Sequence, residues 1–155
     1  MNSPERRTPA HPTLHEAFNR SIIVFLTVCT KNKKPLLAHE SVHALLRQAW
    51  TAADSWLVGR YVLMPDHLHL FCSPAMNTST TLTRWVSFWK SHASRHWPIP
   101  DDAPVWQTNF WDTQLRKEES YSEKWRYTLE NPVRAGLVQN SWDWPYQGEF
   151  HVLNW

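Results

Sequence analysis

The sequence predicts an α+β fold in which an antiparallel sheet carries helices on one face. Two patterns lead to this class. Short runs of β-branched and apolar residues are typical of strands, and longer segments repeat apolar residues at helical spacing. With 155 residues, 42% of them hydrophobic, the chain is large enough for one domain with a substantial core.

Three segments have the composition of strands: 21–30, 56–64 and 67–73. Pro65 and Asp66 lie between the last two, and this pair is typical of a turn, so these strands are predicted to form a hairpin. The segment 105–116 is aromatic and alternates only in places. We expect a fourth strand or an irregular segment there.

Three helices are expected, over about 39–53, over about 81–96 after the cap-like run "NTSTT", and over 120–131 before Pro132. The order of the elements is then strand, helix, strand, strand, helix, strand, helix. The first six match the ferredoxin-like split arrangement, in which the helices cover one face of an antiparallel sheet. The last helix is an addition at the C-terminal side.

Composition places the protein in a reducing compartment. Residues 1–19 are proline-rich and polar and are expected to form a flexible arm, whereas 20–155 are expected to form a single domain. Cys29 and Cys72 lie in strand-like runs and are interpreted as buried thiols. The sequence shows neither an apolar stretch of ~18 residues nor a secretory signal. We therefore expect a cytoplasmic protein that does not bind a membrane.

Charge and aromatic content permit a nucleic-acid partner without requiring one. The net charge is +2, nine histidines add charge at lower pH, and the chain has 11 tryptophans. Tryptophan provides buried area in a core, which is expected to account for more than half of them. It also provides flat faces on which unpaired bases stack.

The stretch "YVLMPDHLHLF" places two histidines on one predicted strand. Side chains two residues apart in a strand share a face, so His67 and His69 project together while Leu68 and Leu70 project into the core. Neutral imidazoles on one face are suited to a shared cation. A pair of surface or hydrogen-bonded histidines is the other interpretation. Cys72 lies on the opposite face, which argues against structural zinc.

The helix over 120–131 carries a tyrosine off its apolar stripe. Tyr121, Trp125 and Leu129 are spaced by four and form that stripe. Tyr127 is about 200° around the helix from Trp125 and faces away from it, together with Asn131. A phenol and an amide in this position can supply a nucleophile and a neutral metal ligand. An exposed tyrosine and a helix-ending asparagine are the plain structural alternative.

Two motifs carry a family resemblance. "YVLMPDHLHLF" resembles the histidine–hydrophobe–histidine (HUH) motif of single-tyrosine transposases, and "YTLENPVRAGLV" at 127–138 resembles the signature of their REP-associated branch. "TVCTKNKKPLL" and "VWQTNFWDTQLR" fit the same branch in the same order. The resemblance covers about residues 20–145. The residue after the tyrosine is usually isoleucine in this family, and here it is Thr128.

The resemblance implies a ferredoxin-like fold and metal-dependent cleavage of single-stranded DNA. Carried over by position, His67, His69 and Asn131 become ligands of a divalent metal, magnesium or manganese, and Tyr127 becomes the nucleophile. Asn131 stands where the wider family often has glutamine. The tyrosine would attack phosphorus, displace a 3′-hydroxyl and form a 5′-phosphotyrosine that permits rejoining. A free phenol has a pKa of about 10, so its deprotonation needs assistance.

The family's partner is a single-stranded DNA hairpin formed by a repetitive extragenic palindrome. Basic and aromatic side chains are candidates for contacts with its phosphates and bases: Arg84, Lys90, Arg95, Arg116, Arg126, Arg134, Trp106 and Trp111. Arg6, Arg7 and the Lys31–Lys34 turn are further candidates for the hairpin backbone. The family contains both monomers and homodimers, and the sequence does not distinguish between them.

Other functions are weighed against this one. A non-cleaving protein that only binds repeat hairpins would share the fold and the partner. A small metal hydrolase would need a carboxylate base, and Asp66 is the one adjacent to the histidines. A relaxase or replication initiator normally has a longer chain. Tyr121 is the rival nucleophile, but its place on the apolar stripe disfavours it.

Overall fold

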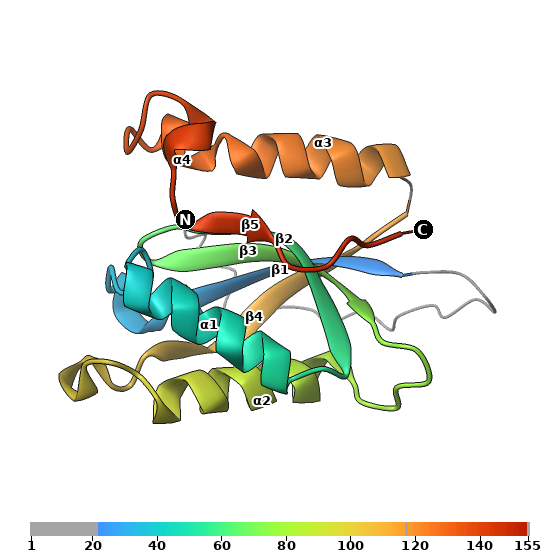
Figure 1. Ribbon diagram of the computed structural model, residues 1–155, viewed down its shortest axis with the longest axis horizontal. Helices are drawn as coiled ribbons and strands as arrows, with labels where there is room; N and C mark the ends of the chain where they lie inside the picture. The colour runs from blue at the N-terminus through green and yellow to red at the C-terminus, as the bar shows by residue number, and fades with distance from the viewer. Residues whose placement is uncertain (1–21, 117, 155) are drawn as a thin grey trace.

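The computed structural model describes residues 22–116 and 118–154 and contains one five-stranded sheet (Figure 1). The strand order is β4-β1-β3-β2-β5, and all four pairings are antiparallel. The strands are β1 Ile23–Thr30, β2 Trp56–Leu63, β3 His67–Pro74, β4 Trp106–Leu115 and β5 Gln147–Glu149. The first four strands in this order give the ferredoxin-like topology, so the predicted fold class is confirmed.

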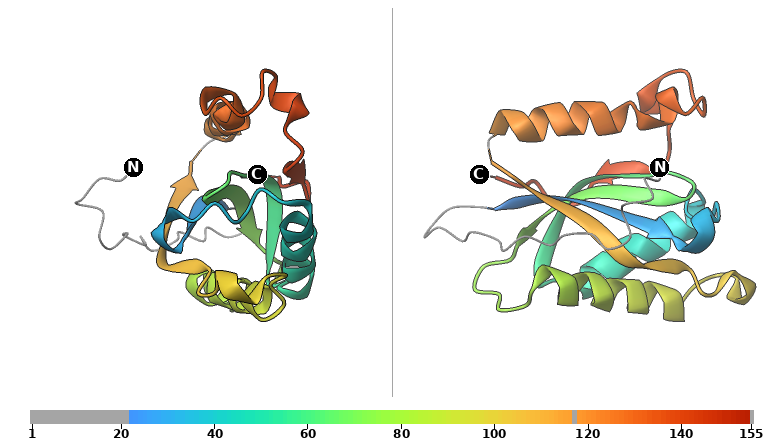
Figure 2. Two further views of the ribbon diagram at one scale, coloured as in Figure 1. Left: turned by 90° about the vertical axis from the view of Figure 1, so that its left-hand side faces the viewer. Right: turned by 180° about the vertical axis from the view of Figure 1, so that it is seen from behind.

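Two helices cover one face of the sheet and a third covers the other (Figures 1 and 2). The helices α1 Glu40–Ala52 and α2 Leu82–Arg95 pack together below the sheet in Figure 1, and α3 Glu118–Leu129 lies above it. The short helix α4 Asn131–Arg134 follows α3. Three 3-10 turns complete the fold: η1 Lys31–Lys33, η2 Pro100–Asp102 and η3 Ser141–Asp143.

The main core lies between the sheet and the α1–α2 layer. Leu68, Leu70 and Cys72 point into it from β3 and are fully buried. Trp85 and Trp89 fill it from α2, as the predicted stripe of that helix requires. Because this core fixes which face of β3 is inside, it also fixes the direction of the two histidines.

A smaller core lies between the opposite face of the sheet and α3. Ile23, Phe71 and Tyr121 are buried in it, and Trp125 packs against them. The Phe71 and Tyr121 rings meet edge to face with centroids 4.7 Å apart. The predicted apolar stripe of this helix thus holds α3 over the histidine face of the sheet.

Three features differ from the sequence prediction. The segment 105–116, expected to be a short strand or irregular, contains the ten-residue strand β4, because it pairs with β1 along most of its length. Pro132 does not simply stop a helix: α3 ends at Leu129, and Pro132 lies in the first turn of α4, where its missing N–H leaves no helical bond unmade. The strand β5 was not predicted, since its three residues have no apolar alternation.

Some predictions concern residues outside those described. The flexible arm at 1–19, with Arg6 and Arg7, lies outside the described residues. Within the described part of the chain, the helices are all too short or too polar to cross a bilayer.

Candidate active site

The histidine pair lies at the centre of the sheet, on the face that α3 covers. β3 is flanked by β1 and β2, and its burial alternates as the sequence predicts, with His67 and His69 half-buried and Leu68 and Leu70 fully buried. The two imidazole centroids are 4.8 Å apart, and the rings are close to perpendicular. Two ring nitrogens can therefore converge on one small ion in front of the sheet.

Each histidine is oriented by a hydrogen bond at Nδ1. Asp66 Oδ1 lies 2.7 Å from His67 Nδ1, and Thr27 Oγ1 lies 2.9 Å from His69 Nδ1. A carboxylate only accepts, so His67 donates from Nδ1, which leaves Nε2 for a metal. This carboxylate–histidine arrangement is typical of metal-ligating histidines. Thr30 in turn donates to the Asp66 carbonyl from its backbone and its hydroxyl, which fixes the turn.

His69 is held in its neutral form. The pKa of His69 is lowered to about 3, mainly by burial and further by electrostatic repulsion from His67, Lys124 and Arg134. Its ring stacks on the Phe25 ring with centroids 5.1 Å apart. A neutral imidazole is the form that ligates a metal. The contribution of Lys124 and Arg134 also shows that the charged side chains of α3 and α4 lie close enough to act on this histidine.

The two tyrosines of α3 have opposite environments. Tyr127 is 63% exposed, whereas Tyr121 is 8% exposed and its hydroxyl is buried without a hydrogen-bond partner. Burial raises the pKa of Tyr121, with the Arg60 charge opposing and Glu149 adding to the shift. A buried phenol with a raised pKa is a poor nucleophile, so the geometry favours Tyr127 over Tyr121.

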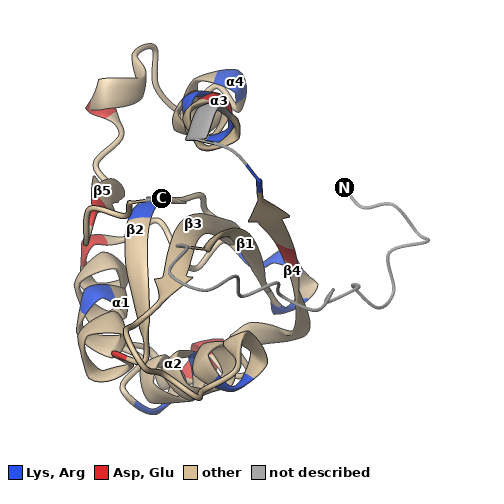
Figure 3. Cartoon of the chain, turned by 90° about the vertical axis from the view of Figure 1, so that its right-hand side faces the viewer, with Lys and Arg blue, Asp and Glu red and all other residues tan. Residues whose placement is uncertain are grey.

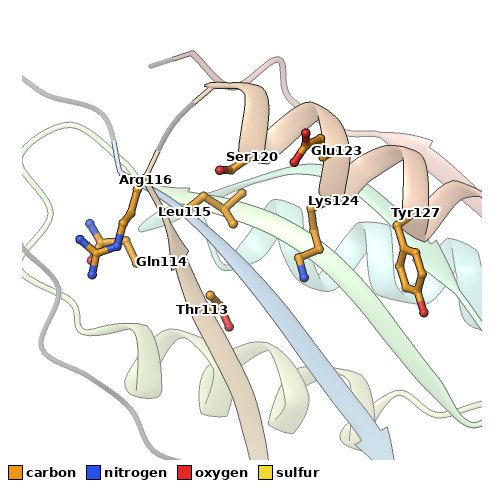
Figure 4. A pocket seen from close by; sticks show the side chains of 8 residues that line it. All are labelled: Thr113, Gln114, Leu115, Arg116, Ser120, Glu123, Lys124 and Tyr127. Atoms are coloured by element: carbon orange, nitrogen blue, oxygen red, sulfur yellow. The ribbon is translucent and has the colours of Figure 1, made fainter.

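Tyr127 lines a cavity of about 730 Å³ between the end of β4 and α3. Figure 4 shows the Lys124 and Tyr127 side chains pointing from α3 towards the sheet. The remaining lining residues are mostly polar: Thr113, Gln114, Leu115, Arg116, Ser120 and Glu123. The Lys124 ammonium lies 5.1 Å from the centroid of the Phe25 ring, which itself stacks on His69. The cavity and the histidine pair are thus linked through Phe25 and Lys124.

Arg134 contacts Tyr127 twice. Its guanidinium carbon lies 3.8 Å from the centroid of the Tyr127 ring, and Nη2 donates to the Tyr127 carbonyl oxygen at 2.7 Å. Thr128, the unusual residue after the tyrosine, is buried, and its hydroxyl donates to the Lys124 carbonyl at 2.7 Å. The substitution of isoleucine by threonine therefore leaves no unsatisfied hydroxyl in the core.

Asn131 begins α4, one helical turn after Tyr127, and is half-buried. No described contact joins its side chain to either histidine, so its role as third ligand stays a prediction. In the described part of the chain, no three His, Cys, Asp or Glu side chains gather in a way that could hold a metal ion. A third protein ligand from this region would have to be of another type, as an amide is.

The candidate DNA contacts do not form one surface. Figure 3 shows lysines and arginines on both helical layers. Arg116, Arg126 and Arg134 are exposed on the side of β4, α3 and α4, whereas Arg84 and Arg95 are exposed on α2, across the sheet from the histidines. Their roles stay predictions.

Two further candidates, Lys90 and Trp106, have structural roles, and a third, Trp111, is partly buried. The Lys90 ammonium donates to the Gln107 carbonyl at 2.8 Å, and burial lowers the pKa of Lys90 to about 8. Trp106 packs edge to face against Trp89 in the main core and against Trp97. Trp111 is half-buried in β4. For Lys90 and Trp106, these contacts leave less of the side chain for phosphates and bases.

Sequence reasoning did not predict the supporting residues. Thr27 pairs with His69 across β1 and β3, and this register cannot be read from one segment. Asp66 was considered only as a base and a turn residue, although a carboxylate directly before a ligand-like histidine was a usable signal. The contacts of Arg134 with Tyr127 depend on the break between α3 and α4.

The fold and the histidine pair define a ferredoxin-like domain with an HUH-type strand, and comparison with known proteins narrows the class. No protein-family model matches the chain. A REP-associated tyrosine transposase of Escherichia coli is 26% identical over 132 residues, which cover 82% of this chain and 75% of that protein. A Haemophilus influenzae protein that carries the same name provisionally is 27% identical over 100 residues, and the match spans 56% of its length.

A solved structure of a REP-associated tyrosine transposase bound to a REP hairpin has the same fold. Its TM-score with this chain is 0.69 at 21% sequence identity, over 88% of this chain and 82% of that one. The chain is therefore similar in sequence to REP-associated tyrosine transposases and shares the fold of one of them.

Proposed function

We propose that the protein is a metal-dependent endonuclease and strand transferase that acts on single-stranded DNA hairpins of the palindromic repeat type. The observation that carries the proposal is the pair of oriented imidazoles on the sheet face that α3 covers, with His69 held neutral and with Tyr127 on that helix. The names of the related proteins support a transposase-type enzyme with a repeat hairpin as its DNA partner.

The site residues fit a divalent metal, magnesium or manganese. Both Nδ1 atoms have partners within the protein, so His67 and His69 would bind through Nε2, with Asn131 as the proposed third ligand. Mixed nitrogen and oxygen ligands suit manganese particularly well. When bound, the metal would neutralise charge on the reacting phosphate.

Tyr127 is the proposed nucleophile. Its oxygen attacks phosphorus, the bond from phosphorus to the 3′-oxygen breaks, and the DNA leaves with a 3′-hydroxyl. The phenolic proton passes to solvent, and the leaving oxygen takes up a proton. The 5′-phosphotyrosine retains the energy of the broken bond, so a second 3′-hydroxyl can reverse the step and join strands.

The surrounding side chains would hold the DNA near the tyrosine. Lys124 and Arg116 line the cavity beside Tyr127 and can bind phosphate oxygens. The simplest metal hydrolase would use Asp66 as the base that activates water. Asp66 does not line this cavity and its carboxylate accepts a hydrogen bond from His67, which disfavours that role. A base for water would have to come from elsewhere.

The test is covalent capture of the DNA. Labelled hairpin repeats from the source genome are incubated with the protein and manganese, magnesium or a chelator, and denaturing gels report any adduct. We expect an adduct with metal that is absent with chelator and absent in Tyr127→Phe. Tight binding without an adduct under all conditions would contradict cleavage and support the non-cleaving hairpin-binding protein instead.

A further inference from the structure

The side chain of Arg134 reaches back across the break between α3 and α4 to the predicted nucleophile. It meets the face of the Tyr127 ring at 3.8 Å and the Tyr127 carbonyl oxygen at 2.7 Å. We infer that Arg134 is a positioning residue that fixes the orientation of the Tyr127 side chain, rather than a general phosphate contact. The inference rests on the proposed function, in which Tyr127 attacks the DNA.

An exposed tyrosine needs such support to act as a nucleophile. Tyr127 is 63% exposed, so the packing that fixes a buried side chain in one rotamer restrains it only weakly. A misplacement of about 1 Å at a reacting group can cost about 100-fold in rate. The Arg134 guanidinium stacks on one face of the Tyr127 ring and so blocks the side-chain rotamers that would place the ring in the volume the guanidinium occupies.

The two contacts require a guanidinium and not only a positive charge. One flat group stacks on the ring, while an N–H at its edge donates to the carbonyl. The carbonyl of Tyr127 lies in the last turn of α3, where carbonyl groups lack an intrahelical donor, so it is available for this bond. A lysine at this position would keep the charge but could not make both contacts in this geometry.

The break between the helices makes the reach possible. α3 ends at Leu129, and α4 begins at Asn131 with Pro132 in its first turn. The Arg134 backbone N–H bonds to the Glu130 carbonyl at 3.0 Å, which fixes the start of its side chain.

The experiment separates positioning from charge. Hairpin affinity and the single-turnover rate of adduct formation at saturating hairpin are measured for Arg134→Lys and Arg134→Gln, in full-length protein with manganese. We expect both variants to react about 10-fold to 100-fold more slowly than the parent. Arg134→Lys should bind the hairpin within about 2-fold of the parent, because its charge remains. Recovery of the parent rate in Arg134→Lys would overturn the inference.

Arg126 supplies the comparison. It is exposed on α3 next to Tyr127, and among the described residues neither a hydrogen bond nor a ring contact joins its guanidinium to the tyrosine. If an arginine contributes charge alone, its lysine variant should keep the hairpin affinity and the reaction rate that its glutamine variant loses. Arg126→Lys and Arg126→Gln should follow that pattern, whereas the Arg134 pair should not.

A second measurement does not depend on activity. The protein is labelled with fluorotyrosine, the Tyr127 resonance is assigned with Tyr127→Phe, and fluorine NMR spectra are recorded without DNA. Loss of the stacked guanidinium in Arg134→Lys should shift or broaden the Tyr127 resonance, and an unchanged resonance would contradict the inference. If Tyr127→Phe still forms the adduct, the proposed function fails, but this spectrum still decides the role of Arg134.

Discussion

The hydrogen bond between His69 and Thr27 offers a sensitive test of the metal site. Thr27 Oγ1 lies 2.9 Å from His69 Nδ1, on the neighbouring strand β1 and directly opposite in register. Thr27→Val keeps the branched shape that suits a strand and removes only the hydroxyl. The ring of His69 then loses the partner that fixes which nitrogen faces the metal.

The expected loss can be estimated from the role of this bond. Partners of this kind are worth about 10-fold to 100-fold in metal affinity, or roughly 1.4 to 2.8 kcal/mol. Folding stability should fall by roughly 1 to 3 kcal/mol, because a half-buried imidazole nitrogen is left without a partner. The variant should therefore fold but bind manganese more weakly.

The assay is a manganese titration of the DNA-free protein followed by electron paramagnetic resonance, with urea unfolding as a check on folding. Thr51→Val is the matched control, since Thr51 is exposed on α1 across the sheet from the histidines. Among the described residues, its hydroxyl bonds only to the Arg47 carbonyl of the same helix. Parent-like manganese affinity in folded Thr27→Val would refute the assignment of His69 as a ligand oriented by Thr27.

Three other results are expected. Tyr121→Phe should still form the adduct on gels. Its free energy of unfolding in urea should equal that of the parent or exceed it by up to about 1 kcal/mol, because the change removes a buried hydroxyl without a partner. Loss of the adduct would make Tyr121 the better candidate for the nucleophile. The free energy of unfolding of the metal-free protein in urea should fall as pH falls from about 6.5 to about 3, because His69 binds a proton in the unfolded chain but not in the folded one. His69→Asn should lack this part of the pH dependence. Lys90→Gln should lower stability by about 1 to 2 kcal/mol through the lost bond to the Gln107 carbonyl, while hairpin affinity by fluorescence anisotropy stays near the parent value; a large loss of affinity would return Lys90 to the DNA contacts.

Much of the fold could be predicted because its patterns are local. The alternation in 67–73 gave both the strand and the face on which the histidines lie, and the spacing of Tyr121, Trp125 and Leu129 gave the packed side of α3. Periodicity depends only on neighbouring residues, so one segment contains all the information it needs. The strand β5 was not predicted because an edge strand of three residues is too short to show an alternation of apolar and polar residues.

The supporting contacts of the site could not be predicted because they join distant segments. The hydrogen bond between His69 and Thr27 follows from strand register, and the approach of Lys124 to Phe25 follows from the packing of α3 on the sheet. Basic side chains were the hardest class to interpret. Lys90 and Arg134 look alike in sequence as solvent-exposed cations, yet one binds strand carbonyls and the other contacts Tyr127.

The central claim is that Tyr127 attacks DNA with the help of a metal held by His67 and His69. The most direct measurement is mass spectrometry of the protein after incubation with a hairpin repeat and manganese, with the modified peptide sequenced. A 5′-phosphate-linked nucleotide on Tyr127, absent with chelator and in His67→Ala, is the expected result. An adduct on Tyr121, or one that forms equally well with chelator, would contradict the claim.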